Sequence, residues 1–326
     1  MNRPPDQRRR QAWSRYWASG SSHSCPGSFD ERYAGAVSAF WHPLIQALPA
    51  DGRVLDACCG NGPIARMVVE QRPDCRVDAV DLAAPQPAWI ADLAEADSGR
   101  VRFHGGVDVA GLPFPDACFD LVCSQFGLEY SDLDSALPEV RRVLATRGCL
   151  ALVAHHAGSV LAQVAADEAG HLAWLLGASG LFDAADAMVD WMAQASTPAG
   201  AAALTSNARA NADRARLNGV LAALSERARV QSTPDVLHET ARSVLGVLDT
   251  ARGAGAGSAR AELQSLGDAL ADGRLRVDEL VAHALNAEAV AGLAAWAEGV
   301  GWRCDAGELR EGGRLLGWTL RFWARD

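Results

Sequence analysis

The sequence predicts an α/β fold, in which helices cover a doubly wound, seven-stranded, mostly parallel sheet with an antiparallel last strand. Between residues 53 and 155, short apolar runs alternate with segments of helical periodicity, which predicts parallel strands joined by right-handed crossovers. The chain ends in two apolar runs around Gly312-Gly313, a pattern typical of a hairpin. We therefore expect N-terminal helices, the sheet, and a large helical insertion before the last two strands.

The elements follow from the periodicity of the apolar residues. The first 50 residues predict two helices around a flexible turn, and one apolar stripe of the second helix comprises Phe29, Tyr33, Val37, Phe40 and Trp41. Strands are expected at 53–57, 76–81, 101–105, 119–124 and 149–155. Helices are expected near 62–71, 87–96 and 132–145, and again through Leu293 and Trp296.

The stretch 157–285 differs from the rest, because it is alanine-rich, has helical periodicity and shows no strand pattern. It is too long to be a structureless loop. We expect three parts: an N-terminal helical lid at 1–50, a cofactor domain made of 51–156 and 286–326, and the insertion at 157–285. The insertion is expected to serve as a substrate lid or a dimerisation element.

Composition narrows the function. The chain has 326 residues, a net charge of −10 and no lysine, which argues against a nucleic-acid partner. Eight cysteines without CxxC spacing argue against disulfides and a zinc site, so we expect no metal. No apolar run reaches the ~20 residues of a membrane span, and no signal segment is recognised, so a cytoplasmic protein is expected.

Residues 53–65 carry most of the functional information. An apolar strand ends at Asp56, the chain turns on Gly60 and Gly62, and a helix begins, which predicts a nucleotide-cofactor cradle. The match to G-x-G-x-x-[GA], with Asp81 about 20 residues on, would by itself suit a nicotinamide dinucleotide. However, Asp56 and two cysteines precede the first glycine, and Pro63 removes one N–H donor from the helix start.

The following residues resemble a known family, the class I S-adenosylmethionine-dependent methyltransferases. Val54-Leu-Asp-Ala-Cys-Cys-Gly-Asn-Gly is similar to their first motif, and Leu112-Pro-Phe-Pro-Asp-Ala-Cys-Phe-Asp-Leu-Val to the run entering their fourth strand. The run from Glu139 to Leu150 is similar to the helix and turn before their fifth strand. The resemblance covers about 50–156 and 286–326. One departure is Cys58, where the family usually has a glycine.

The resemblance implies S-adenosylmethionine as cofactor and S-adenosylhomocysteine as product. Asp81 resembles the ribose-binding acid and Asp108 the acid near adenine, while the Asp56 carboxylate suits the cofactor's ammonium, directly or through water. Alternatives are a solvated strand end for Asp81 and a helix cap or Asx turn for Asp108. The expected cofactor-binding residues are Asp56, Cys58, Gly60, Gly62, Asp81, Leu82, Asp108, Val109, Gln125, Phe126 and Trp17.

Methyl transfer from a sulfonium is an in-line displacement, which needs a base only when the acceptor must lose a proton. The candidate catalytic residues are His155, His156 and His23, each of which could instead be an ordinary packed or loop histidine. Tyr16, Trp17, Phe29 and Tyr33 could close over the cofactor, with a ring facing the sulfonium. The same rings could equally pack as a helix stripe.

The sequence thus predicts a bacterial methyltransferase that acts on a small-molecule or lipid-like acceptor, at oxygen. Two alternatives stay open. The first is a catalytically silent S-adenosylmethionine-binding protein that uses the insertion to bind a partner or to form a homodimer. The second is an NAD(P)-dependent oxidoreductase.

Overall fold

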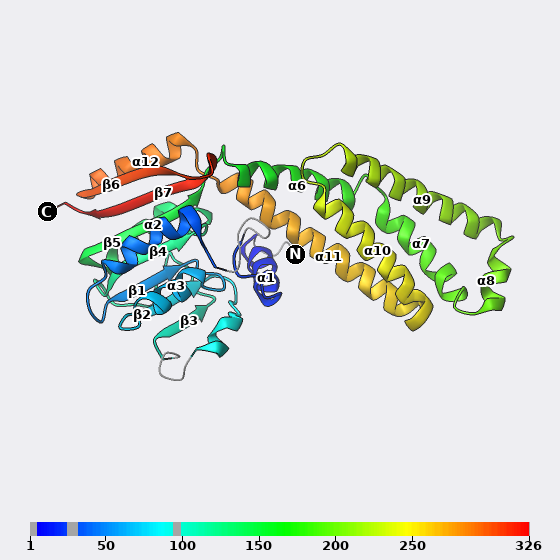
Figure 1. Cartoon of the computed structure of the whole chain (residues 1–326), viewed down its shortest axis with the longest axis horizontal. Coiled ribbons are helices and arrows are strands. Elements are labelled where there is room, and N and C mark those ends of the chain that lie inside the picture. The colour runs from blue at the N-terminus through cyan, green and yellow to red at the C-terminus, as the bar shows by residue number, and fades with distance from the viewer. Residues whose placement is uncertain (1–4, 25–31, 94–98, 326) are drawn as a thin grey trace. The chain divides into compact units, whose positions relative to one another are not determined.

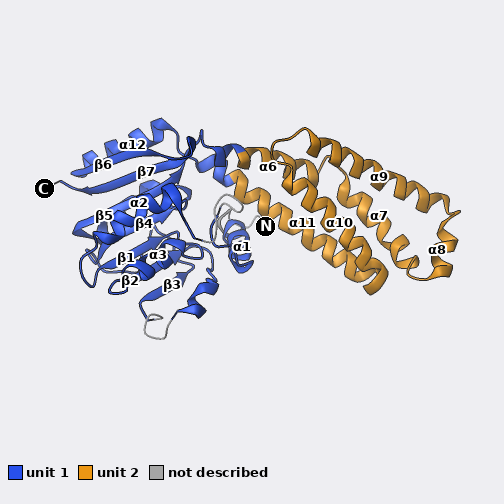
Figure 2. Ribbon diagram, in the orientation of Figure 1, with its two compact units in different colours: residues 1–163, 279–326 blue, residues 164–278 orange. Residues whose placement is uncertain are grey.

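The computed structural model describes residues 5–24, 32–93 and 99–325, and it divides into two compact units. The first unit combines Met1–Gln163 with Glu279–Asp326, and the second comprises Val164–Asp278 (Figure 2). Phe29, which the sequence placed on a helix stripe, lies outside the described residues. The second unit falls within the predicted insertion at 157–285.

A seven-stranded sheet forms the first unit, in the order β3-β2-β1-β4-β5-β7-β6 (Figure 1). The strands are β1 Arg53–Ala57, β2 Arg76–Asp81, β3 Val101–Gly105, β4 Phe119–Gln125, β5 Leu144–His155, β6 Trp302–Glu311 and β7 Arg314–Ala324. The first five strands run parallel, and β7 runs antiparallel to both β5 and β6. The predicted fold class is confirmed.

Helices flank this sheet. They are α1 Pro5–Ala18, α2 Gly35–Gln46, α3 Pro63–Gln71, α5 Leu133–Val143 and α12 Ala287–Gly299, with short 3-10 helices η1 Ala88–Asp92 and η2 Leu128–Tyr130. The α5 and α12 helices share one apolar core with the strands, in which Leu137, Val140, Leu293 and Phe322 are buried. The burial of these residues is the main force that holds the helices on the sheet.

The larger differences from the prediction lie at three boundaries. Of the helix expected at 87–96, the structure describes residues up to 93, and these form the 3-10 helix η1, preceded by Pro85 and Pro87, whose ring nitrogens cannot donate hydrogen bonds. The second N-terminal helix begins at Gly35, so Tyr33 precedes it. Strand β5 begins at Leu144 rather than 149, because that residue already pairs with Phe119 across a register shift.

The second unit is helical throughout. Its helices are α7 Leu181–Gln194, α8 Pro198–Leu204, α9 Ala208–Arg229 and α10 Asp235–Ala254, together with most of α6 Val160–Leu176 and α11 Ala256–His283. Their core contains Leu181, Met188, Leu217, Leu224 and Val244. In the described part of the chain, no single helix has the length and apolar character for a membrane crossing. Helices α6 and α7 reach that length and apolar character only when they are taken together as one pair, which is bent by 46°.

Candidate cofactor site

A cavity of about 580 Å³ lies in the first unit, next to the glycine turn and the carboxyl ends of β1, β2 and β4. This volume is within the roughly 300–1,000 Å³ range of small-ligand sites, and open α/β sheets bind ligands at this edge. Ten of the predicted site residues line it: Trp17, His23, Cys58, Gly60, Asp81, Leu82, Asp108, Val109, Gln125 and Phe126. Asp56, Gly62, His155 and His156 do not.

The glycine turn adopts a left-handed backbone, with φ of 55° at Cys58, 52° at Gly60 and 68° at Gly62. A Cβ at Gly60 would lie 2.5 Å from Cζ2 of Trp17, so only glycine leaves room for this ring. Cys58 adopts the conformation for which the resembling family uses glycine. This placement costs strain, because non-glycine residues rarely take a positive φ.

Gly62 has a structural rather than a contacting role. A Cβ there would lie 2.5 Å from Cζ of Phe103, and the Gly62 N–H donates to the Cys59 carbonyl at 2.8 Å. Gly62 therefore sets the turn and lets β3 pack against it, instead of facing the cavity as predicted.

Asp81 ends β2 on the cavity wall. Its Oδ2 accepts the Gly60 N–H and its Oδ1 accepts the Ala83 N–H, both at 2.8 Å. Burial raises the pKa of this carboxyl above its usual value, while the two N–H groups oppose that rise. The carboxylate is thus held rigidly, and its remaining lone pairs are available to a ligand's hydroxyl groups.

Asp56 does not reach the cavity. It is 1% exposed, and its Oδ2 accepts the Ala65 N–H in the first turn of α3 at 3.1 Å. Burial, reinforced by the charge of Asp81, raises the pKa of Asp56 to about 7, although the Ala65 N–H opposes the rise. This geometry offers no direct contact to an ammonium, because the Asp56 carboxylate caps the start of α3.

The hydrogen bond from the Ala65 N–H to Asp56 also bears on the nicotinamide dinucleotide alternative. A pyrophosphate would need the free N–H groups at the start of α3. Pro63 supplies none, and the Ala65 N–H is already taken by Asp56. The helix start is therefore a poor phosphate site.

Asp108 and Val109 lie together on the wall beyond β3. The Asp108 Oδ1 accepts the Ala110 N–H at 2.9 Å, which is the Asx turn that the sequence left open as an alternative. Asp108 is exposed and retains lone pairs for a ligand, whereas Val109 is 4% exposed and belongs to the apolar core.

The three candidate histidines have different surroundings in the structure. His155 is fully buried behind the wall, and its Nδ1 lies 2.7 Å from Oε1 of Glu129, so it does not face the cavity as the predicted base would. Successive strand residues point to opposite faces, and His156 instead stacks on Trp318 at 4.5 Å and accepts the Gly158 N–H. Of these three candidates, His23 alone lies on the cavity, where its ring stacks near Tyr33.

The sequence reasoning missed several wall residues. Arg9 and Trp13 of α1 line the cavity with Trp17, and Tyr130 and His283 line it from η2 and α11. Arg9 donates to the Tyr130 carbonyl at 2.6 Å and pairs with Glu279 at 3.1 Å. Arg9, Trp13 and Trp17 recur every four residues, so helical spacing could have identified this face.

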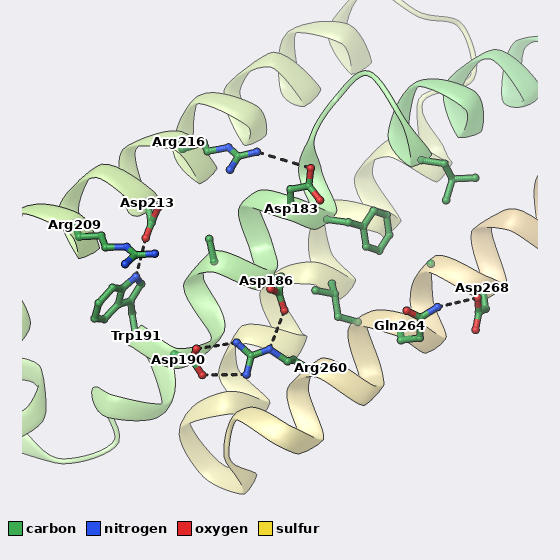
Figure 3. Close-up of a pocket in the computed structure, with 15 residues that line it drawn as sticks. Asp183, Asp186, Asp190, Trp191, Arg209, Asp213, Arg216, Arg260, Gln264 and Asp268 are labelled. Carbon is green, nitrogen blue, oxygen red and sulfur yellow. Dashed lines mark hydrogen bonds and ion pairs between the residues drawn. The ribbon is translucent and has the colours of Figure 1, made fainter.

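A second, larger cavity of about 1090 Å³ lies in the second unit (Figure 3). Its charged side chains mostly bind one another: Arg260 pairs with Asp186 and Asp190, and Asp213 accepts the Trp191 indole N–H. It contains neither the glycine turn nor a strand end. We therefore assign the cofactor site to the first unit.

Comparison with known proteins supports this assignment. Residues 54–148, which contain the glycine turn, Asp81, Asp108 and Gln125, match the family described as "Methyltransferase domain". This stretch is a class I S-adenosylmethionine-dependent methyltransferase domain. The α1 helix and the helical unit lie outside the match.

Individual relatives agree with this assignment. The demethylmenaquinone methyltransferase of Thermus thermophilus is 40% identical over 105 residues, which are 32% of this chain and 47% of the relative. The malonyl-(acyl-carrier protein) O-methyltransferase of Alcanivorax borkumensis is 32% identical over 136 residues, or 41% of this chain and 46% of the relative. The chain thus spans about half the length of the curated relatives that it matches.

One solved structure, of the YcgJ protein from Bacillus subtilis, covers 42% of this chain and 58% of that chain at 27% identity. Its TM-score is 0.30, a similarity too low to bear on the fold. The fold assignment of the methyltransferase domain rests instead on its strand order.

The residues on the wall fit S-adenosylmethionine, the cofactor of this domain. The Asp81 carboxylate suits ribose hydroxyls, and the glycine turn leaves room for close approach. Gln125 presents a buried amide nitrogen, Nε2, that has no hydrogen-bond partner among the described residues and suits an acceptor on the cofactor. Carboxylates at the strand ends also favour a cationic ligand over a pyrophosphate.

Proposed function

We propose that the whole chain is an S-adenosylmethionine-dependent methyltransferase that methylates a small-molecule or lipid-like acceptor at oxygen. The observation that carries the proposal is the cavity in which Asp81, Asp108 and Gln125 meet at the glycine turn. The matched family supports the cofactor. The class of acceptor and its methylation at oxygen are proposed in addition to the cofactor.

The chain's residues would bind and orient rather than react covalently. When bound, the cofactor supplies a methyl group on a sulfonium, which the acceptor displaces in line. Asp81 would hold the ribose and Asp108 the adenine amine, with Val109 beside it. Trp13 and Trp17, stacked at 5.5 Å, would exclude water and face the positive charge.

His23 is the proposed base. It is 7% exposed and lies on the cavity, and Tyr16 holds its backbone carbonyl at 2.8 Å through the phenol O–H. A neutral imidazole there would take the proton from an acceptor hydroxyl as the methyl group is transferred. Cys58 is less suited to this role, because burial raises the pKa of its thiol well above the usual value.

The relatives support two kinds of acceptor, since one is named for demethylmenaquinone and the other for malonyl-(acyl-carrier protein). Their matches cover 32% and 41% of this chain. We propose that residues 1–50 act as a lid over the cofactor and that the helical insertion contacts the acceptor or a second copy. We also propose that the protein works in the cytoplasm.

A transfer assay tests this function. The full chain is incubated with methyl-labelled S-adenosylmethionine and a panel of hydroxyl, carboxyl and amine acceptors, and labelled product is extracted. His23→Gln is expected to lower the rate by about 10²- to 10⁴-fold while S-adenosylhomocysteine affinity is unchanged. Cofactor binding without transfer to any acceptor would favour the catalytically silent alternative.

A further inference from the structure

The side-chain amide of Gln125, at the end of β4, is oriented by Trp41. The indole N–H of Trp41 donates to Oε1 of Gln125 at 2.6 Å, and Trp41 is fully buried in α2. An indole nitrogen can only donate a hydrogen bond, so it must face the amide oxygen. The contact therefore decides which end of the amide is left for other partners.

That other end is a buried donor on a residue that lines the cavity. Nε2 of Gln125 is buried and has no hydrogen-bond partner among the residues that the structure describes. Gln125 itself is 9% exposed and lines the cavity. Leaving a buried donor unsatisfied costs free energy, so an acceptor supplied by a ligand would stabilise this arrangement.

The position of β4 indicates which acceptor this is. Asp81 ends β2 and Gln125 ends β4, and β1 lies between these two strands. Neighbouring strands are roughly 4.8 Å apart, so the two strand ends are about 10 Å apart. With the ribose at Asp81, the amino-acid end of S-adenosylmethionine extends toward β4. Of its two charged groups, the ammonium donates and only the carboxylate accepts.

We propose that Trp41 is a positioning residue for the cofactor: it turns the Gln125 amide so that Nε2 donates to the methionine carboxylate. Such a bond to a charged acceptor is stronger than a neutral one. The inference rests on the proposed function, because it requires S-adenosylmethionine in this cavity. It also gives a role to α2, which contributes no sequence motif: through Trp41, this helix orients the donor that binds the cofactor's amino-acid end.

Two ligands separate this role from general damage to the site. S-adenosylhomocysteine has the amino-acid end, whereas 5′-methylthioadenosine keeps the nucleoside and the sulfur but lacks that end. Both are titrated by calorimetry into the full chain and its variants. Gln125→Glu keeps the acceptor for Trp41 but removes the donor, so S-adenosylhomocysteine affinity should fall roughly 10- to 150-fold. Affinity for 5′-methylthioadenosine should not change.

Trp41→Phe removes the indole N–H together with part of the buried ring. It should weaken the binding of S-adenosylhomocysteine at least about threefold, again without an effect on the binding of 5′-methylthioadenosine. The matched control is Trp318→Phe, since that indole donates to the Leu285 carbonyl at 2.9 Å and does not line the cavity. The control should bind both ligands like the wild type.

The outcomes are distinguishable. If the wild type binds neither ligand, the proposed function itself fails. If the wild type binds both, and Gln125→Glu and Trp41→Phe keep the wild-type preference for S-adenosylhomocysteine, the positioning role is overturned. Equal losses for both ligands also overturn it, because they reveal a collapsed site rather than a lost carboxylate contact.

Discussion

His155 donates twice to Oε1 of Glu129, through its backbone N–H at 2.8 Å and its Nδ1 at 2.7 Å. Both side chains are buried, at 0% and 2% exposure. The pair ties the segment after β4 to the end of β5, directly behind Phe126, whose ring lies 4.4 Å from the imidazole. A histidine at a strand end thus supports the cavity wall without lining the cavity.

Breaking that pair should cost stability. Glu129→Ala leaves the Nδ1 and the backbone N–H of His155 buried without their acceptor, so the free energy of unfolding should fall by about 3–5 kcal/mol. Urea denaturation measures this decrease in the free energy of unfolding. As a control, Glu298→Ala breaks an exposed pair with Arg325 and should cost less than about 1 kcal/mol. Equal effects of the two variants would contradict the assignment.

Asp56 should make stability depend on pH. Its pKa rises from 3.8 to about 7 on folding, so between these values the folded state binds a proton that the unfolded state has lost. Its contribution is therefore greatest below about pH 4 and is lost as the pH rises to 7. Asp56→Asn, which can still accept from Ala65, should remove this loss, on the order of a few kcal/mol.

The check is urea denaturation of both proteins at pH 5 and pH 8. The variant should gain on the wild type as the pH increases. A constant difference at the two pH values would show that Asp56 is not held protonated in the folded protein.

Asp81 should control cofactor affinity. Asp81→Ala removes the proposed ribose acceptor and the two bonds that hold the turn, so S-adenosylhomocysteine affinity should fall by at least ~1.5–3 kcal/mol. Asp78→Ala is the matched control, because Asp78 lies on the same strand but pairs with Arg53 and His104, away from the cavity. Calorimetry should show unchanged affinity for the control; a similar loss in both variants would argue against the ribose assignment.

Gly60 should tolerate no side chain. Gly60→Ala places a Cβ against Trp17 at a positive φ, so cofactor affinity and stability should both decrease, the latter by roughly 1–2 kcal/mol. Gly292→Ala in α12 meets open space and should stabilise the helix by up to about 1 kcal/mol. Thermal unfolding compares them. A Gly60→Ala protein as stable as the Gly292→Ala protein would contradict the close approach of Trp17.

The sheet was predictable because its signals are local. Strands β1, β2 and β3 match the predicted ranges residue for residue, since each is a short segment in which apolar residues recur among polar or glycine residues. Asp81 and Gln125 were found for the same reason, because strand ends in a parallel sheet converge at one edge.

The rest depends on contacts between residues far apart in the chain. Arg9 reaches Glu279, and Trp41 reaches Gln125, and no local pattern encodes either pairing. The sequence also gave no means of deciding which of His155 and His156 faces the cavity. The structure shows that neither does, because the His155 ring binds Glu129 and the His156 ring stacks on Trp318.

The most direct test of the assigned cofactor is calorimetric titration of the full chain with S-adenosylmethionine and, separately, with a reduced nicotinamide dinucleotide. S-adenosylmethionine should bind saturably with 1:1 stoichiometry, Asp81→Ala should weaken this binding, and the dinucleotide should not bind. Binding of the dinucleotide alone, or no response to S-adenosylmethionine at millimolar concentration, would contradict this assignment.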